Sequence, residues 1–355
     1  MRRSIPDYPQ IVLVALIVVV SGALIFAAST STVAFGTYNP SWDGASDLRS
    51  EADTVDVESE IVYNTSSYTS TPANDTLALI LSPESSYSSS DTERIASFVR
   101  NGGTVLIAED TGNHSNDVLA AIGADIRFDK RMLRDERNNY RSPAMPVASN
   151  VSDHPLTTDV DRLTFNHGTA VRPNNSTVLV SSSGYAYLDT NRNSELDDDE
   201  SLGTYSVAAV ESVGDGRVIT VSDPSIFINT MLDRSGNRAF VRTVFQQHNQ
   251  LLLDYSHAGS LPVLSVALLV LRDTPLFQFF LGALGVAVLG IGVRRPELFT
   301  QLTERWTTQG HTSPGAEPEE LAAVIRKRHP DWDDERTERV IQAIMNQREN
   351  SSRND

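Results

Sequence analysis

The stretch TLALILSPESSYSSSDTERIASFVRNGGTVLIAED, residues 76–110, carries the pattern that decides the fold. Its two ends, 76–82 and 104–110, are short apolar runs bounded by polar residues. Such runs are typical of strands that are buried on both faces of a parallel sheet. The segment between them has apolar residues at helical spacing and ends at a pair of glycines, so the stretch predicts a strand–helix–strand unit.

The helix of this unit is expected to begin at Ser90 and Glu93, which have the spacing of a capping box. Its apolar stripe consists of Ile95, Phe98 and Val99. Parallel strands joined by a helix form a right-handed crossover, so further units of this kind would extend a single sheet.

Similar segments lie on both sides of this unit. The other expected strands are 57–63, 124–128, 176–188, 204–212 and 216–223, with a hairpin turn at 213–217, and the other expected helices are 114–124 and 235–253. The order of these elements predicts an α/β fold, with a Rossmann- or flavodoxin-like, mostly parallel sheet covered by helices on both faces.

Composition narrows the class of protein. The chain has 355 residues, which suits one medium domain with appendages or two small domains, and its net charge is −17. Because phosphate binding needs a concentrated basic face, we expect no nucleic-acid partner. Only two of the 29 basic residues are lysines, a bias that resembles proteins adapted to molar salt, although ordinary acidity is the alternative. The absence of cysteine excludes disulfides, thiolate metal sites and cysteine nucleophiles.

Two apolar segments, 11–28 and 276–293, are predicted to be transmembrane helices. Arginines precede the first and follow the second, so the positive-inside tendency places both chain ends in the cytoplasm. A cleaved signal peptide is the alternative for the first segment. The prediction is therefore a two-pass protein of the cell membrane, in contact with lipid. A shorter apolar run is read as a juxtamembrane helix at 261–272, although a three-span arrangement is the alternative.

This topology divides the chain into parts. The expected parts are a cytoplasmic N-terminus (1–10), an extracytoplasmic α/β domain (30–260) and a cytoplasmic helical tail (294–355). Two short amphipathic helices are expected in the tail, around 317–328 and 333–348. Their apolar face is too small for an independent core, so we expect the tail to dock onto a protein partner.

The segment YLDTNRNSELDDDE, residues 187–200, has the oxygen-ligand spacing of a calcium loop. The predicted metal-binding residues are Asp189, Asn191, Asn193, Glu195, Asp197 and Glu200. Glu195 would contribute its backbone carbonyl, and Glu200 would bind through both carboxylate oxygens. Ser194 stands where such loops usually have glycine, which is expected to weaken the site. The alternative is a solvated acidic turn.

Other polar residues follow predicted buried strands. Glu109 and Asp110 follow one strand, and Asp223 follows another, so these three residues are candidates for ligand binding at the carboxyl edge of the sheet. The alternative is that they cap the helices that follow. His167 would reach the same crevice if the chain were a hydrolase, although a polar loop histidine is the simpler interpretation.

Three stretches resemble a known family: SSSDTERIASFVRNGGTVLIAEDTGN, YLDTNRNSELDDDESLGTYSVAAVESVGDGRVITVSDPSIFIN and LLLDYSHAGS. They are similar to an uncharacterised family of membrane proteins of halophilic archaea. The outside domain of that family has a class I glutamine-amidotransferase-like fold and is also similar to the GldG-type subunits associated with ABC transporters. The resemblance covers roughly residues 40–260. It implies a possible MoxR-type AAA ATPase partner, because members are commonly encoded near such ATPases.

The resemblance also has departures. The family often carries an Asp-Glu-Tyr-His-His-Gly-like segment, which here reads DYSHAG at 254–259, so one acidic residue and one histidine are missing. Amidotransferase chemistry needs a cysteine thiolate, which this chain lacks, so that activity is not expected.

Together these observations predict a non-catalytic, membrane-anchored binding or scaffold protein with a structural calcium loop. The resemblance implies an accessory subunit of an ABC-transporter or AAA-ATPase-linked membrane complex. The partner would be reached through the tail or the transmembrane helices. The alternative is a cell-envelope hydrolase that uses the crevice of Glu109, Asp110 and His167.

Overall fold

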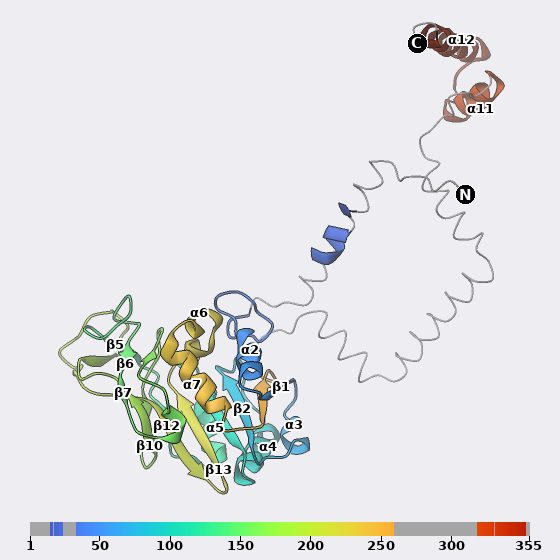
Figure 1. The fold of residues 1–355 in the computed structure, drawn as a ribbon. Helices are drawn as coiled ribbons and strands as arrows, with labels where there is room; N and C mark the ends of the chain where they lie inside the picture. The colour runs from blue at the N-terminus through green and yellow to red at the C-terminus, as the bar shows by residue number, and fades with distance from the viewer. Residues whose placement is uncertain (1–14, 17, 24–32, 259–317, 330, 353–355) are drawn as a thin grey trace. The chain divides into compact units, whose positions relative to one another are not determined.

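The computed structural model describes most of the chain. The described residues are 15–16, 18–23, 33–258, 318–329 and 331–352. The chain divides into two compact units, Met1–Val270 and Leu271–Asp355 (Figure 1). The first unit contains all of the described strands, and the second contains two described helices.

The first unit is mixed α/β and is built on one eight-stranded sheet. Its strands, in spatial order, are β1 (Glu58–Val62), β14 (Gln250–Asp254), β2 (Thr76–Leu81), β3 (Thr104–Ala108), β13 (Gly216–Val221), β12 (Ser206–Val213), β10 (Thr177–Ser181) and β7 (Asn150–Val151). Neighbours from β1 to β13 pair in parallel, whereas the pairs from β13 to β7 are antiparallel. Four of the seven neighbouring pairs are therefore parallel and three are antiparallel, so the sheet is mixed.

Shorter elements complete this unit. Its helices are α2 (Asp47–Thr54), α3 (Ser67–Ser70), α4 (Ser89–Arg100), α5 (Ser115–Ile122), α6 (Asn229–Leu232) and α7 (Ser235–Phe245), with 3-10 turns η1 (Pro155–Thr157) and η2 (Pro224–Phe227). Three two-stranded ribbons pair β4 (Arg127–Phe128) with β9 (Val171–Arg172), β5 (Met132–Asp135) with β11 (Ala186–Asp189), and β6 (Val147–Ala148) with β8 (Leu163–Thr164).

The sheet separates two apolar clusters. Along β2, Leu77 and Leu79 belong to the cluster that includes the apolar residues of α2 and α7, whereas Ala78 and Ile80 belong to the cluster of α4 and α5. Successive side chains of a strand point to opposite faces, so a strand covered on both faces must be apolar at every position. This explains why the central strands are continuous apolar runs, and it confirms the prediction of buried strands at 76–82 and 104–110.

The first turn of α4 differs from the expected one. The capping box is formed by Ser88 and Asp91, and not by Ser90 and Glu93. Ser88 Oγ accepts a hydrogen bond from the Asp91 backbone N–H at 3.2 Å, and Asp91 Oδ2 accepts one from the Ser88 N–H at 3.1 Å. A run of consecutive serines offers several possible caps, and the contacts of Asp91 with Arg94 and with Thr65 of another segment select one of them.

The prediction of a single helix at 235–253 is wrong for the second half of this segment. The helix α7 ends at Phe245, and residues 250–254 form β14, which lies between β1 and β2 in the sheet. The three leucines of β14 are buried, and they divide between the two apolar clusters. The periodicity of a short apolar run does not distinguish a helix from a buried strand. Here the segment is a strand because it pairs with both β1 and β2 in the sheet.

The strand predicted at 124–128 is also corrected. Only Arg127–Phe128 forms a strand, and it pairs antiparallel with β9 in a ribbon outside the main sheet. The antiparallel β12–β13 hairpin confirms the turn predicted at 213–217, where Gly214 has a φ of +62° that favours glycine.

The structure corrects the expected membrane topology. Within the residues it describes, no helix is long and apolar enough to cross a membrane. In the first predicted span, 11–28, the described residues 15–16 and 18–23 are helical, and the others lie outside the described residues. The second predicted span, 276–293, and the helix predicted at 261–272 lie outside the described residues. The prediction of a two-pass protein with two transmembrane helices is wrong on this finding. The cytoplasmic placement of both chain ends and the extracytoplasmic placement of the α/β domain depended on it and lose their basis.

The second unit contains α11 (Pro318–Arg328) and α12 (Asp334–Ser352). These helices match those predicted around 317–328 and 333–348. An ion pair between Arg326 and Asp334, at 2.7 Å, joins them across the turn.

A carboxylate joins two helices that are far apart in the sequence. Glu51 of α2 accepts hydrogen bonds from Nε of Arg238 at 3.2 Å and Nε of Arg242 at 2.5 Å, both on α7. The Glu51 side chain is 11% exposed. Removing its charge would take the carboxylate from Arg242 and leave Arg238 with only its 3.3 Å pair with Asp233.

We predict that Glu51→Gln lowers the free energy of unfolding by roughly 1–2 kcal/mol, because the pair is partly buried and doubly bonded. Urea unfolding would measure the change. The matched control is Glu93→Gln, which breaks the exposed Glu93–Arg100 pair and should cost less than about 0.5 kcal/mol. Equal losses in the two variants would contradict the prediction.

Candidate functional site

The carboxyl ends of the central strands bring several polar side chains together. Glu109 follows β3, and its backbone N–H donates to the Val221 carbonyl at the end of β13 at 3.1 Å. Ser82 follows β2, and its N–H donates to the Ala108 carbonyl at 2.9 Å. These backbone bonds hold the three strand ends side by side, as the sequence predicts for parallel strands.

Glu109 is 1% exposed and is fully engaged by its own surroundings. Its Oε1 accepts hydrogen bonds from Ser82 Oγ at 3.1 Å and from the N–H groups of Asp110 at 3.0 Å and Gly112 at 3.1 Å. Its Oε2 accepts from Ser115 Oγ at 2.9 Å. Burial raises the pKa of Glu109, and these donors oppose the shift. The carboxylate therefore shapes the turn from β3 into α5.

Asp223 holds the neighbouring turn in the same way. It is completely buried, and it accepts hydrogen bonds from the N–H groups of Asn166 at 2.5 Å and Ser225 at 2.7 Å. Burial raises the pKa of Asp223 to about 7, with a smaller contribution from the charge of Asp110. Gly168 lies directly against this turn, because a Cβ added to it would be 2.8 Å from the Ser222 carbonyl oxygen.

His167 does not join this group. Its side chain is exposed, its φ is +64°, and its Nδ1 lies 2.8 Å from Oδ1 of the adjacent Asn166. The strand ends thus bring Glu109, Asp110 and Asp223 together. His167 follows Asn166, which bonds to Asp223, but its exposed side chain makes no hydrogen bond or ion pair with Glu109 or Asp110 among the described residues.

A second polar group at this edge was not predicted. Asp254 at the end of β14 accepts hydrogen bonds through Oδ2 from the hydroxyls of Tyr68 at 2.7 Å and Tyr87 at 3.4 Å. The ring of His257 stacks on Tyr87, with centroids 3.7 Å apart. Burial, and then the charge of Asp254, raise the pKa of both tyrosines well above the usual value. The segment DYSH was a visible signal, but its tyrosine partners are too distant in sequence to be found.

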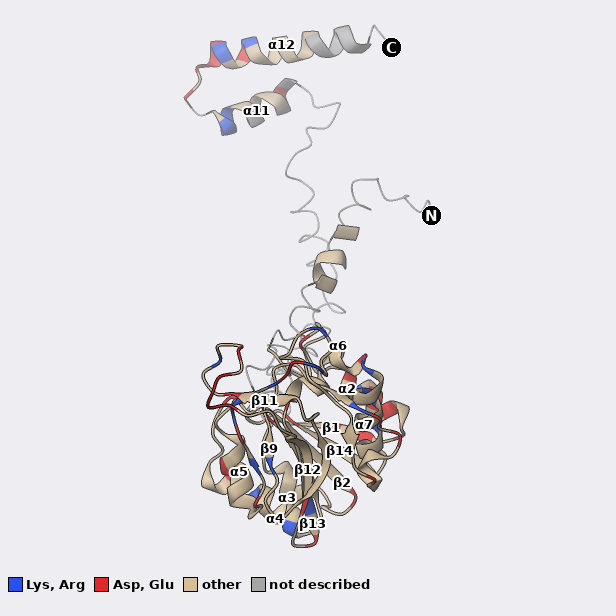
Figure 2. Cartoon of the chain, turned by 90° about the vertical axis from the view of Figure 1, so that its left-hand side faces the viewer, with Lys and Arg blue, Asp and Glu red and all other residues tan. Residues whose placement is uncertain are grey.

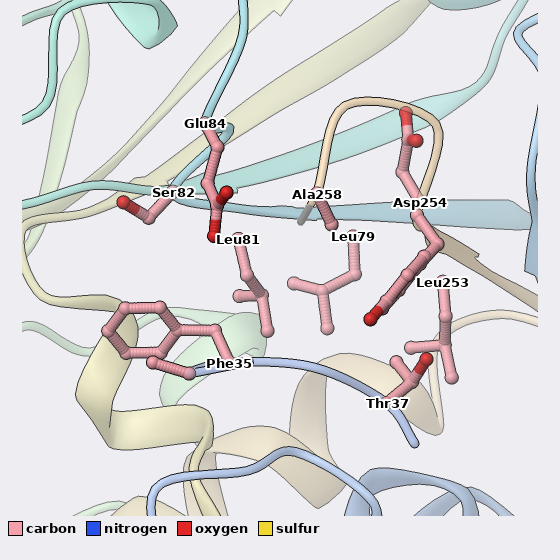
Figure 3. A pocket seen from close by; sticks show the side chains of 11 residues that line it. Phe35, Thr37, Leu79, Leu81, Ser82, Glu84, Leu253, Asp254 and Ala258 are labelled. Carbon is pink, nitrogen blue, oxygen red and sulfur yellow. The ribbon is translucent and has the colours of Figure 1, made fainter. Parts of the chain in front are cut away.

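A pocket opens beside Asp254 (Figure 3). The apolar part of its lining comes from the ends of β2 and β14, and Phe35 and Thr37 close the opposite side. Glu84 and Asp254 supply its two carboxylates, and Ser82 connects it to the group around Glu109.

Within the segment 187–200, the first three residues end β11, and residues 190–200 form a largely exposed acidic loop at the end of the unit where acidic side chains gather near β11 (Figure 2). Asp189 is buried at its start, and Ser194 has the φ of +71° that glycine favours. Asn191 and Asn193 both donate to Asp197, so these predicted ligand positions converge. Within the described part of the chain, however, no three histidine, aspartate or glutamate side chains form a group ready to hold a metal ion.

Comparison with protein families gives one match. Residues 37–245 match a family described as a domain of unknown function, DUF4350. The chain belongs to the DUF4350 family. The matched region runs from before α2 to the end of α7, so the inserted strand β14 lies beyond it. Comparison with curated proteins gives no match. The resemblance to membrane proteins of halophilic archaea and to GldG-type subunits stays a prediction.

Solved structures resemble the DUF4350 chain distantly. The mmIFT52 N-terminal domain is 16% identical, with a TM-score of 0.39 over 52% of this chain and 80% of that one. A ThuA-like protein of Bacteroides uniformis is 15% identical, with a TM-score of 0.32 over 52% and 74%. A β-galactosidase of Rahnella sp. R3 is 12% identical, with a TM-score of 0.28 over 48% of this chain and 22% of that one. Likenesses of this strength carry no conclusion about activity.

We predict that Asp223 makes stability depend on pH in a definite direction. Its pKa of about 7 is higher than that of an aspartate in the unfolded chain, so between about pH 4 and 7 the folded state keeps a proton that the unfolded state has released. The contribution of Asp223 to the free energy of unfolding is therefore greatest in acid. It falls by up to about 1.4 kcal/mol per pH unit as the pH rises through this range.

Urea unfolding of the wild type and of Asp223→Asn at a series of pH values would test this expectation. The amide cannot titrate, so the variant should show a shallower decline between pH 4 and 7. Parallel profiles for the two proteins would show that Asp223 ionises normally despite its burial.

Proposed function

We propose that this DUF4350 chain is a non-catalytic binding and scaffold domain. The observation that carries the proposal is a pair of exposed tyrosines held in place by arginines near the β5–β11 ribbon. Tyrosine and arginine are enriched among the residues that dominate binding energy at protein interfaces. An aromatic side chain that is already ordered before binding loses little conformational entropy when it meets a partner.

The first tyrosine is Tyr140, which is 39% exposed. The guanidinium groups of Arg141 and Arg234 lie 5.0 Å and 4.7 Å from its ring centroid. These distances are within the range of cation–π attraction, so two arginines from separate segments fix the orientation of one exposed ring.

The second tyrosine is Tyr185, which is 45% exposed. Arg137 lies 4.6 Å from its ring centroid and donates a hydrogen bond to its hydroxyl at 2.6 Å. Arg137 and Tyr140 belong to the same short segment after β5, so one loop organises both tyrosines. This surface suits a protein partner that presents carboxylates to the arginines and apolar side chains to the tyrosine rings.

The carboxylates at the strand ends support a non-catalytic role. Glu109 and Asp223 accept hydrogen bonds from the chain's own backbone and hydroxyl groups, and these bonds shape two turns. A general base needs a free lone pair directed at its substrate. From the resemblance stated above, the partner we propose is a subunit of an ABC-transporter or AAA-ATPase-linked complex. The helices α11 and α12 offer it a second contact.

We predict that the double variant Tyr140→Ala/Tyr185→Ala lowers capture of the partner at least about tenfold, because each truncation removes an anchor worth more than about 1 kcal/mol. The measurement is cross-linking of the tagged, full-length chain in its native cells, followed by quantification of the captured proteins by mass spectrometry.

Two controls accompany this experiment. Trp42→Ala removes a more exposed aromatic side chain, 66% exposed, on which no arginine of the described residues stacks, and should leave capture unchanged. Asp110→Asn should also leave it unchanged, since the proposal gives this carboxylate no role. Equal capture by the wild type and the double variant would refute the proposed surface. A loss of cellular function in Asp110→Asn with capture intact would favour the hydrolase instead.

A further inference from the structure

The carboxylate of Asp189 is buried without enough partners. Asp189 is the last residue of β11, and its side chain is 0% exposed. Its Oδ2 accepts a hydrogen bond from the Ser194 N–H at 3.0 Å, and Nε of Arg134 lies 3.8 Å from the same oxygen. Its Oδ1 is buried and has no hydrogen-bond partner among the described residues. A buried carboxylate oxygen without a hydrogen-bond partner is costly, so a bound water or cation is expected to contact it.

The Asp189 side chain is turned into the loop that follows it. The bond from Ser194 fixes this direction, because Ser194 lies in the middle of that loop. The φ of Ser194 is +71°, the left-handed conformation that a calcium loop requires at this position and that glycine normally supplies. The backbone thus adopts the required turn although the residue is serine.

The other polar side chains of the loop converge within it. Nδ2 of Asn191 and Nδ2 of Asn193 donate to Oδ2 of Asp197, at 2.7 Å and 2.9 Å. Glu200 reaches back across the loop, where Oε1 accepts from the Thr190 N–H at 2.6 Å and Oε2 lies 3.4 Å from the Asp197 nitrogen. The side chains of the third, fifth and ninth positions therefore contact one another, and those of the first and twelfth positions bond to the backbone of the same loop.

We propose that residues 189–200 form a calcium-binding site, an inference that goes beyond the proposed function and does not depend on it. The ligands are the side-chain oxygens of Asp189, Asn191, Asn193, Asp197 and Glu200, together with the backbone carbonyl of Glu195. All are hard oxygen donors, and a set of six or more suits Ca²⁺ better than Mg²⁺, which keeps most of its water. Three of the ligands are carboxylates, and within the described residues these do not yet form a metal-binding group, so the ion has to draw Asp189, Asp197 and Glu200 together when it binds.

Binding requires one local exchange. The two asparagines now direct their Nδ2 groups at Asp197, and they must present their amide oxygens to the ion instead. A rotation of about half a turn at each amide would give up the hydrogen bonds that the two Oδ1 atoms now accept from the Asn193 and Glu195 N–H groups, at 2.9 Å and 2.8 Å, so coordination to the ion has to replace them. The ion would then satisfy Oδ1 of Asp189 and screen the repulsion among the carboxylates of the loop.

We predict that the full-length chain, stripped with chelator, binds one Ca²⁺ in isothermal titration calorimetry, even with millimolar Mg²⁺ present. Its melting temperature should rise with calcium concentration, because the ion binds the folded loop. Glu200→Gln and Asp197→Asn should each weaken binding by at least about tenfold, since each removes a carboxylate ligand.

Asp198→Asn and Asp199→Asn are matched controls. They remove the same charge from exposed positions of the same loop that are not ligand positions, so the affinity should stay within about threefold of the wild type. Ser194→Gly should tighten binding by up to about tenfold, because glycine adopts a positive φ without strain. Both ligand variants alter exposed or half-buried side chains, so a folding failure is not expected to obscure the result.

Other outcomes would overturn the inference. Absence of calcium binding by the folded wild type would do so directly. If all four amide variants lose affinity equally, the loop attracts cations only by its charge. Capture of the partner by the Tyr140/Tyr185 surface is measured separately, so failure of either proposal can be recognised without the other.

Discussion

Burial of both faces of the central strands is the constraint on which the rest of the structure depends. Strands β14, β2 and β3 lie between two apolar clusters, so their side chains contribute to the core at nearly every position. Polar groups can appear only where these strands end. As a result Ser82, Glu109 and Asp254 stand at one edge of the sheet, and each must find partners there.

The partners found at that edge come mostly from the protein itself. Glu109 is surrounded by hydroxyl and N–H donors, and Asp223 closes a loop onto the end of β13. Asp254 is held by two tyrosine hydroxyls. Fixed donors of this kind rigidify turns, whereas the surface near the β5–β11 ribbon keeps ordered aromatic rings exposed to solvent.

The sequence allows some of these features to be predicted and hides others for physical reasons. The buried strands around α4 are readable because burial on both faces leaves an unbroken apolar run. The regular spacing of polar residues in the 189–200 loop is also readable, since these residues are close together in the sequence. The strand β14 was mistaken for a helix because its three leucines have no periodicity of their own. The contacts of Asp254 with Tyr68 and Tyr87 depend on tertiary structure, and no local pattern reveals them.

The position of β14 also bears on how the protein is made. Strand β14 lies between β1 and β2 and pairs in parallel with both. A chain that leaves the ribosome from its N-terminus must therefore carry two facing, unpaired strand edges until residue 254 has emerged. During that interval the edge of β2 is a template for any extended segment, including one from a neighbouring nascent chain. Late closure by β14 makes the completed sheet depend on the chain as far as residue 254, and a truncation before residue 250 would leave the core open at its centre.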